Sequence, residues 1–377
     1  MKLMRTWAMA RKEFIHIFRD PRSLGMGIAI PMIMLILFGY ALTLDVDKVP
    51  LVIWDQNRSL SSREFISHFS GSRYFSLQGF VDRYGEVEQA IDSRRALVSL
   101  IIPADFSGRL ASGKTAKVQL IVDGSDSNTA TIASGYAEVI ATAFSQDILL
   151  DHFKRRGGGS PTIPFEVRPR VWFNADLESR NYIIPGLIAV IMMVIAALLT
   201  SLTVAKEWEQ GTMEQLISTP VKSQELILGK LFPYFCIGLF DVLLAVLMGE
   251  FLFQVPLRGN VALIFAQAAI FLIGTLSLGL LISIVTKSQL LASQLAMVAT
   301  FLPAFLLSGF AYPIRSMPPF LQWITHLVPA KYFVVLLKGI YLKGVGPGVL
   351  YVEGIFLAVF GLVMFVLANR KFKKRLA

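Results

Sequence analysis

The sequence predicts an α-helical integral membrane protein with six transmembrane helices and an α/β extracytoplasmic domain inserted between helices one and two. Hydrophobic residues make up 54% of the 377-residue chain and charged residues only 16%, whereas a soluble domain usually carries about 25% charged residues. The shortage is uneven, because residues 45–180 hold 33 of the 62 charged residues (36 Lys+Arg plus 26 Asp+Glu). A segment of ordinary polarity is therefore embedded in a chain too apolar to be soluble.

The chain opens with residues 1–22, which predict a cytoplasmic amphipathic helix lying in the membrane interface. Its apolar residues recur at spacings of three and four, namely Leu3, Trp7, Ala10 and Phe14. Charged residues such as Arg5, Glu13 and Arg19 lie mostly off that stripe. A basic amphipathic helix beside a span is typical of the membrane surface. Two interpretations stay open: a simple anchor, and a gate-linked helix that also touches a cytoplasmic partner.

Six apolar runs are long enough to cross a bilayer, which takes about 20 helical residues. They carry no charge apart from Asp241 and Glu353, and cover residues 23–44, 181–205, 231–249, 259–286, 288–314 and 344–369. The segment 312–343 is also apolar, but prolines interrupt it. We expect it to form short helices in a re-entrant extracytoplasmic segment and not a seventh span.

Lysine and arginine near the ends of the spans predict the orientation. Residues 1–22 hold six of them, and the basic tail 370–377 holds five. Both termini are therefore expected in the cytoplasm, together with the loop 206–228. Residues 45–180 are then outside, and the expected location is the cell inner (cytoplasmic) membrane.

The domain 45–180 alternates strand-like and helix-like segments. The strand-like runs, rich in Val, Ile, Leu and Phe, are 49–55, 74–82, 96–102, 117–123 and 165–173, and a long helix is expected over 129–153. Residues Gly108–Thr115 fit the phosphate-loop pattern GxxxxGK[ST]. A phosphate loop needs a strand before it and a helix after it, and the order here is reversed, so we interpret the match as coincidence.

The distribution of charged residues and of potential metal ligands excludes several classes of function. The net charge is +10, but residues 45–180 carry −1 (16 minus 17) and the apolar remainder +11 (20 minus 9), a membrane pattern and not a nucleic-acid pattern. One cysteine and four scattered histidines form no metal-ligand spacing. We expect no metal site, no catalytic residues and no cofactor bound by this chain.

The loop after the second predicted span is acidic, although inside loops usually favour Lys and Arg. It presents Glu207, Glu209 and Glu214, with Gly211, Thr212 and Pro220 marking its turns. The loop is either a solvated cap on the span or the contact site for a protein partner.

Asp241 lies near the centre of a predicted span, where an ionisable group is costly and is by default a functional candidate. It is either a helix–helix hydrogen-bonding or subunit-interface group, or a proton-coupling residue. Met192, Met193, Phe301 and Phe305 are candidates for lining a substrate path, with ordinary packing as the alternative.

Five segments resemble the permease subunits of type 2 ATP-binding-cassette (ABC) transporters, in the drug-exporter-like branch with a large outer domain. The resemblance covers essentially the whole chain and is carried by residues 11–24 with Pro31, 102–130, 170–189, 206–234 and 306–346. It implies two permease subunits, identical or homologous, and two copies of an ABC ATPase subunit that holds ATP and Mg²⁺. A periplasmic adaptor is a candidate further partner.

The resemblance also assigns roles to the cytoplasmic elements. Loop 206–228 resembles the coupling helix that contacts the ATPase, through Glu207, Glu209, Gly211, Thr212, Glu214 and Pro220. The first helix resembles the connecting helix, with Trp7, Arg11, Phe14 and Arg19.

The expected function is the permease subunit of an ATP-driven exporter for a hydrophobic or amphipathic, drug-like or lipid-like, substrate. The alternatives are an ion-coupled secondary transporter that uses Asp241, and a non-transporting membrane protein that binds the envelope.

Overall fold

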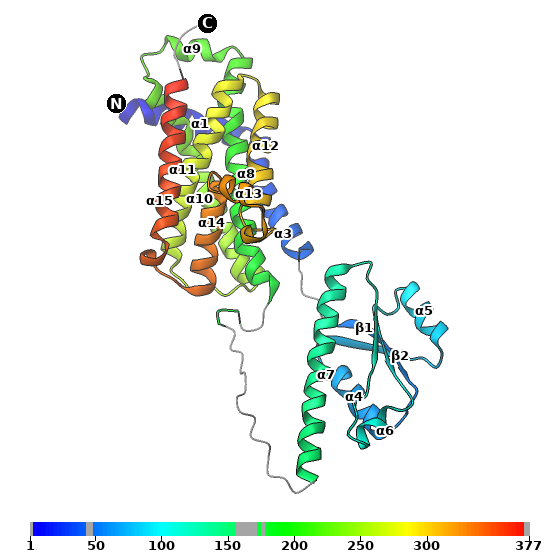
Figure 1. Ribbon diagram of the computed structural model, residues 1–377. Helices are drawn as coiled ribbons and strands as arrows, with labels where there is room; N and C mark the ends of the chain where they lie inside the picture. The colour runs from blue at the N-terminus through cyan, green and yellow to red at the C-terminus, as the bar shows by residue number, and fades with distance from the viewer. Residues whose placement is uncertain (1–2, 43–47, 156–171, 175–177, 373–377) are drawn as a thin grey trace. The chain divides into compact units, whose positions relative to one another are not determined.

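The computed structural model describes residues 3–42, 48–155, 172–174 and 178–372 (Figure 1). The chain divides into two compact units, a helical unit of Met1–Thr43 with Arg170–Ala377 and an α/β unit of Leu44–Pro169. The α/β unit overlaps most of the segment 45–180, whereas residues 170–180 belong to the helical unit.

Five described helices are long and apolar enough to cross a membrane. They are α8 (Ser179–Glu209), α10 (Ser223–Leu247) with the π-helical turn η2 (Met248–Leu252), α11 (Val261–Thr286), α12 (Gln289–Leu307) and α15 (Pro347–Lys371). Each contains the greater part of one predicted apolar run, because an unbroken stretch of about 20 apolar residues has few other stable environments.

The first predicted span, 23–44, is not among these five. Its residues form α2 (Pro21–Leu24), the π-helical turn η1 (Gly25–Ala29) and α3 (Ile30–Ala41), and the apolar helix within them, Gly27–Ala41, is shorter than a full span. Pro31 is the second residue of α3, and it cannot donate a backbone hydrogen bond to the preceding turn of helix. Five of the six predicted runs therefore form helices long and apolar enough to cross a membrane in the described residues, and the following bent pair, which was not predicted as a span, is the sixth candidate if it counts as one.

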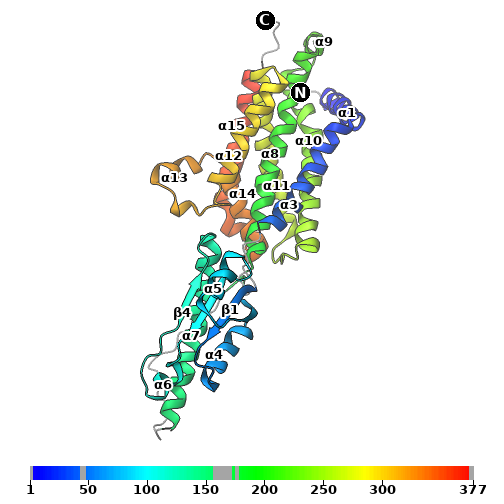
Figure 2. The same cartoon turned by 90° about the vertical axis from the view of Figure 1, so that its right-hand side faces the viewer.

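That bent pair lies in the predicted re-entrant segment. Helix α13 (Pro319–Thr325) is followed by α14 (Pro329–Lys338) and the π-helical turn η4 (Gly339–Lys343), with a bend of 81°. This geometry fits a broken span or a re-entrant loop. Helix α14 is buried, and Phe333 stacks on Phe271 of α11 with ring centroids 4.2 Å apart. Figure 2 shows α13 standing away from the bundle.

Helix α8 forms the centre of the helical unit, with 94% of its apolar window buried. Gly279 of α11 lets the two helices meet, because a Cβ there would lie 2.2 Å from the Ala197 carbonyl oxygen. At this contact Thr200 Oγ1 donates a hydrogen bond to the Leu276 carbonyl oxygen, at 2.9 Å. Small residues that admit a neighbouring backbone are the usual means of close helix packing in membranes.

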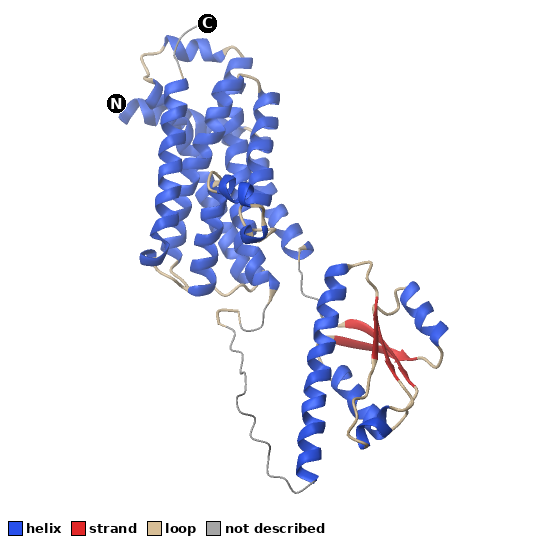
Figure 3. Cartoon of the chain, in the orientation of Figure 1, coloured by secondary structure: helices blue, strands red, loops and turns tan. Residues whose placement is uncertain are grey.

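The α/β unit is built on a four-stranded sheet in the order β2-β1-β3-β4 (Figure 3). Strands β1 (Val49–Asp55), β2 (Phe75–Phe80) and β3 (Val98–Ile102) are parallel, and β4 (Gln119–Val122) is antiparallel to β3. The expected strand at 165–173 lies outside the described residues, except for Trp172 and Phe173, which are not in a strand.

Helices cover both faces of this sheet. They are α4 (Leu60–Ser70), α5 (Tyr84–Asp92), α6 (Phe106–Ala111) and α7 (Ser127–Arg155). Leu51 and Ile53 of β1 belong to a core with α4, α6 and α7, whereas Val52 packs into a second core with Val87 of α5. Alternate residues of a strand point to opposite faces, so β1 contributes to both cores.

The elements around the phosphate-loop match do not have the order that a phosphate loop requires. Helix α6 precedes the loop and β4 follows it, the reverse of a phosphate loop. The loop is held by Arg109, whose Nε donates to the Thr115 carbonyl oxygen at 2.8 Å.

Candidate functional site

The first helix, α1 (Leu3–Arg19), packs along α10 at one end of the helical unit. Gly229 of α10 permits this contact, because a Cβ at that position would lie 2.5 Å from Met9 Cβ and 3.0 Å from the Thr6 carbonyl oxygen. Phe232 lies between the rings of Trp7 and Phe14, with centroids 6.4 Å and 6.1 Å away. The position of α1 is therefore defined by contacts and not by amphipathicity alone.

Helix α8 ends at Glu209 and the chain turns sharply into a short helix, α9 (Thr212–Ser218). Gly211 makes the turn in the left-handed region, at a φ of 69°, which glycine adopts without steric cost. Glu214 is exposed in the first turn of α9, and Met213 is buried. Figure 1 shows α9 at the end of the bundle where α15 also ends.

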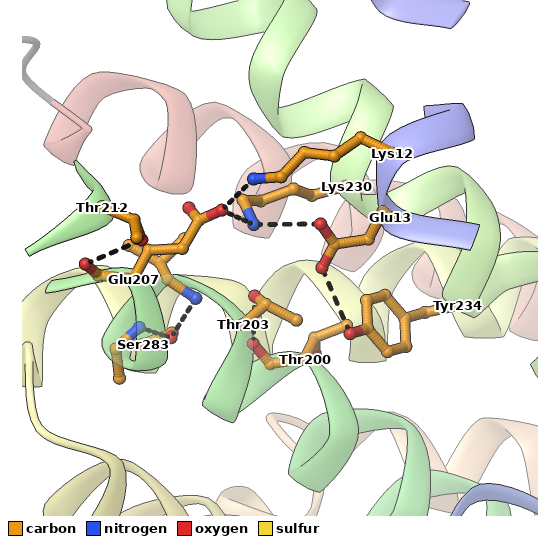
Figure 4. A network of polar contacts seen from close by, with 11 residues as sticks. Lys12, Glu13, Thr200, Thr203, Glu207, Thr212, Lys230, Tyr234 and Ser283 are labelled. Atoms are coloured by element: carbon orange, nitrogen blue, oxygen red, sulfur yellow. Dashed lines mark hydrogen bonds and ion pairs between the residues drawn. The ribbon is translucent and has the colours of Figure 1, made fainter. Parts of the chain in front are cut away.

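A buried network of charges joins α1, α8 and α10 (Figure 4). Lys230 Nζ lies 2.9 Å from Glu207 Oε1 and 3.4 Å from Glu13 Oε2. Lys12 Nζ lies 3.0 Å from the same Glu207 oxygen. Tyr234 donates a hydrogen bond from its hydroxyl to Glu13 Oε1, at 3.3 Å. We call Lys12, Glu13, Glu207, Lys230 and Tyr234 the charge network.

The network balances two carboxylates against two ammonium groups. Lys230 and Glu13 are almost fully buried, with side-chain exposures of 1% and 4%. A buried charge is stable only when it is paired and hydrogen-bonded, and removing one partner of such a pair costs about 3–5 kcal/mol. The network therefore fixes the relative positions of three helices, and any movement of one is resisted by the other two.

Two further contacts join α1 to the segment around α9. Lys206 Nζ lies 3.3 Å from Asp20 Oδ2, just beyond the end of α1. At the other end of α1, Arg5 Nη1 donates to the Pro220 carbonyl oxygen at 2.6 Å. Together with Lys12 and Glu207, these contacts link α1 at three points to the segment 206–220.

Glu209 does not join the network but binds the first residue of α12. Its Oε1 accepts from the backbone N–H of Gln289 at 2.8 Å, and its Oε2 from the Gln289 side-chain amide at 2.5 Å. A carboxylate at a helix N-terminus satisfies an unpaired N–H and complements the helix dipole. On the same side, Lys287 Nζ lies 4.3 Å from the centre of the Trp208 ring.

The candidate coupling residues therefore have different environments. Glu207 is buried, Glu209 is hydrogen-bonded to α12, and Glu214 is exposed. Thr212 Oγ1 donates to the Glu207 carbonyl oxygen at 3.4 Å. On α1, Arg11 and Arg19 are exposed, whereas Phe14 is half-buried.

The candidate path residues fall into two groups. Met192 and Met193 are buried within α8, with exposures of 3% and 2%. Phe301 and Phe305 of α12 are partly buried and stack on each other, with centroids 5.8 Å apart. Asp241 is buried in α10, and its Oδ1 has no hydrogen-bond partner among the described residues.

The sequence did not indicate that Glu13 or Lys230 would be central. The prediction that Glu13 lies off the apolar stripe is wrong, because the residue is 3% exposed. A signal was present: Ala10, Glu13 and Ile17 stand three and four positions apart, so Glu13 shares a face with two buried apolar residues.

Comparisons with known proteins agree with this architecture. Residues 21–369 match the model of the ABC-2 family transporter proteins. The chain is 38% identical over 374 residues to the probable multidrug ABC transporter permease YbhS of Escherichia coli, covering 99% of this chain and 97% of the relative. It is 33% identical over 342 residues to the probable multidrug ABC transporter permease YbhR of the same organism, covering 90% of each chain.

The apolar helices and these matches together define a multi-pass inner-membrane permease of the ABC type. The chain belongs to the ABC-2 family of transporter proteins. Members of this family are the membrane subunits of transporters, and the family implies partnership with an ABC ATPase subunit.

Proposed function

We propose that this chain is the permease subunit of an ATP-driven exporter that moves hydrophobic or amphipathic, drug-like or lipid-like, molecules out of the cytoplasm or the inner leaflet. The relatives YbhS and YbhR are both named as probable multidrug permeases. The observation that carries the proposal is the charge network, because it connects the exposed α9 turn to α1 and α10.

The ATPase docks on α9 and α1 in this proposal. Two ATPase copies, holding ATP and Mg²⁺, bind beneath two permease chains, identical or homologous, and a periplasmic adaptor is a further candidate partner. ATP binding moves α9, and Glu207 passes that movement to Lys230 and Glu13. The nucleotide-bound ATPase must favour one arrangement of the helices for any shift to occur.

The proposed topology places both termini and α9 in the cytoplasm. Helix α3 with the turn η1 then serves as a short first span, and the α/β unit lies outside. Helices α13 and α14 form a re-entrant element on the outer side.

The test is co-purification of the permease with its ABC ATPase. Glu214→Arg reverses an exposed charge on α9, and we expect it to abolish both co-purification and transport. The control is Glu88→Arg, an exposed glutamate of α5 in the α/β unit, which should change neither. Full co-purification of Glu214→Arg would refute the assigned docking site.

A second candidate function rests on Asp241. Asp241 Oδ1 is buried and has no hydrogen-bond partner in the described part of the chain. A carboxyl group that binds and releases a proton within a span would have this environment. Ion-coupled transport predicts that Asp241→Asn folds but loses transport, and that transport persists without the ATPase. Under the main proposal, Asp241→Asn retains ATP-driven transport.

A further inference from the structure

An apolar groove of about 720 Å³ runs between α1 and the three helices α10, α11 and α15. Its lining includes Leu3, Trp7, Phe232, Ile273, Leu362 and Phe365, and no charged residue contributes to it among the described residues. This volume is within the range of about 300–1,000 Å³ that is typical of ligand sites. Three of its four walls are helices long and apolar enough to cross a membrane, so an apolar chain from the bilayer is the occupant that fits its lining.

The groove is not closed by the described residues. Trp7 is 58% exposed and Leu362 is 64% exposed, although both line it. On the α15 wall, a Cβ added at Gly361 would lie 3.5 Å from Gly274 Cα of α11, and one added at Gly274 would lie 3.2 Å from Gly361 Cα. The helix packing behind the groove is thus tight, and the groove is open on the side where Trp7 and Leu362 are exposed.

The charges that flank the groove are cationic. Arg370 and Lys371 are exposed in the last turn of α15, beyond Phe365. Arg11 is exposed on α1, one turn after Trp7. The acidic residue of α1, Glu13, is neutralised within the charge network, and Glu353 lies near the opposite end of α15. Cations at the membrane surface attract anionic lipid headgroups.

We propose that the groove binds an anionic phospholipid, with one acyl chain between α1 and α15 and the phosphate beside Arg11, Arg370 and Lys371. The bound chain lies against the face of α1 that carries Leu3, Trp7 and Ala10. Because α1 carries Lys12 and Glu13, the lipid helps to set the position of the network. The assignment of this lipid to the cytoplasmic leaflet rests on the proposed topology. The groove and the cations beside it do not depend on that topology.

Trp7 is a built-in reporter for this site. We would replace the other four tryptophans (Trp54, Trp172, Trp208 and Trp323) by Phe and place the full chain in nanodiscs. Phosphatidylglycerol or phosphatidylcholine with brominated acyl chains then quenches Trp7 from within the groove. We expect the anionic lipid to bind roughly fivefold or more tightly, the factor that a single cation near the surface contributes.

Two sets of variants test the site. Ile273→Phe with Leu362→Phe fills the groove and should remove the saturable quenching. Val285→Phe with Val349→Phe is the matched control, since both valines are exposed on α11 and α15 outside the groove lining. Replacing Arg11, Arg370 and Lys371 by Gln should abolish the headgroup preference, and exchanging Arg and Lys at these positions should retain it.

Three results would overturn the proposal. Equal quenching by both lipids would mean an ordinary lipid boundary. Quenching that survives the filled groove would place the lipid elsewhere. Quenching that shows no headgroup preference but is relieved by a lipophilic cation such as rhodamine 6G would make a transported substrate the occupant. The assay contains no ATPase, so its failure is distinguishable from failure of the proposed transport function.

Discussion

Glu207 and Lys230 meet 2.9 Å apart, at the point where α8 and α10 approach the first helix of the chain. Glu207 is the last buried acidic residue before the α9 turn, and Lys230 is 1% exposed. Glu13, from α1, binds the same ammonium group. The contact therefore joins the exposed end of the bundle to its interior.

Replacing Lys230 by Met should destabilise the helical unit by about 3–5 kcal/mol, because two buried carboxylates lose their shared counter-charge. The measurement is chemical unfolding in detergent micelles, followed by tryptophan fluorescence. Lys12→Met is the matched control: Lys12 is 48% exposed, and its loss should cost no more than about 1 kcal/mol. Equal effects of the two variants would contradict the central role of Lys230.

The stability of Lys230→Met should be partly restored by adding Glu13→Gln and Glu207→Gln. These changes remove the uncompensated charges that the lysine substitution leaves behind. The coupling is the difference between the change in unfolding free energy of the triple variant and the sum of the separate changes. It should be favourable by about 0.5–3 kcal/mol. Strict additivity would mean that the three side chains do not act as one network.

Gly229→Val should separate α1 from α10, because even its Cβ would lie 2.5 Å from Met9 Cβ. Overpacking of this kind costs about 1–3 kcal/mol. The separation is measured by a cross-link between cysteines that replace Met9 and Pro233, one turn of α10 beyond Gly229. The link should form in the parent chain and fail in the variant. Gly348→Val, at a position with open space around it, is the control.

Glu209→Ala should loosen the start of α12 by about 0.5–2 kcal/mol, the usual cost of losing an N-terminal cap. Glu209→Gln keeps an acceptor oxygen for the Gln289 N–H and should cost less. Hydrogen exchange of the first α12 amides measures the effect. If Glu209→Ala left these amides protected but abolished ATPase co-purification, Glu209 would contact the ATPase directly.

Gly279→Ala should destabilise the contact between α8 and α11, where the two backbones leave no room for a methyl group. The added carbon would lie 2.2 Å from both the Ala197 carbonyl oxygen and Thr200 Oγ1, so the helices must move apart. We expect a loss of about 1–3 kcal/mol in micelle unfolding. The matched control is Gly135→Ala in α7, where nothing lies within 4 Å; a similar loss there would remove the steric explanation.

The sequence was sufficient where one local physical rule dominates. The run 259–286 became α11, Val261–Thr286, because an apolar stretch of this length is stable as a membrane helix. The strand expected at 49–55 is β1, Val49–Asp55, since β-branched residues bounded by turn residues favour a strand. For the run 23–44, the described apolar helix is Gly27–Ala41, with a π-helical turn at Gly25–Ala29 and Pro31 in the turn that follows.

By itself, then, the sequence determined which segments are apolar enough for the membrane, where the α/β unit is inserted, and which family the chain resembles. Only the tertiary structure decided which charges meet, since Glu13 and Lys230 are 217 positions apart. It also decided that Glu207 turns inward while Glu214 stays exposed. Hydropathy depends on composition over a short window, whereas the pairing of buried charges depends on how distant helices pack, and no local pattern encodes that packing.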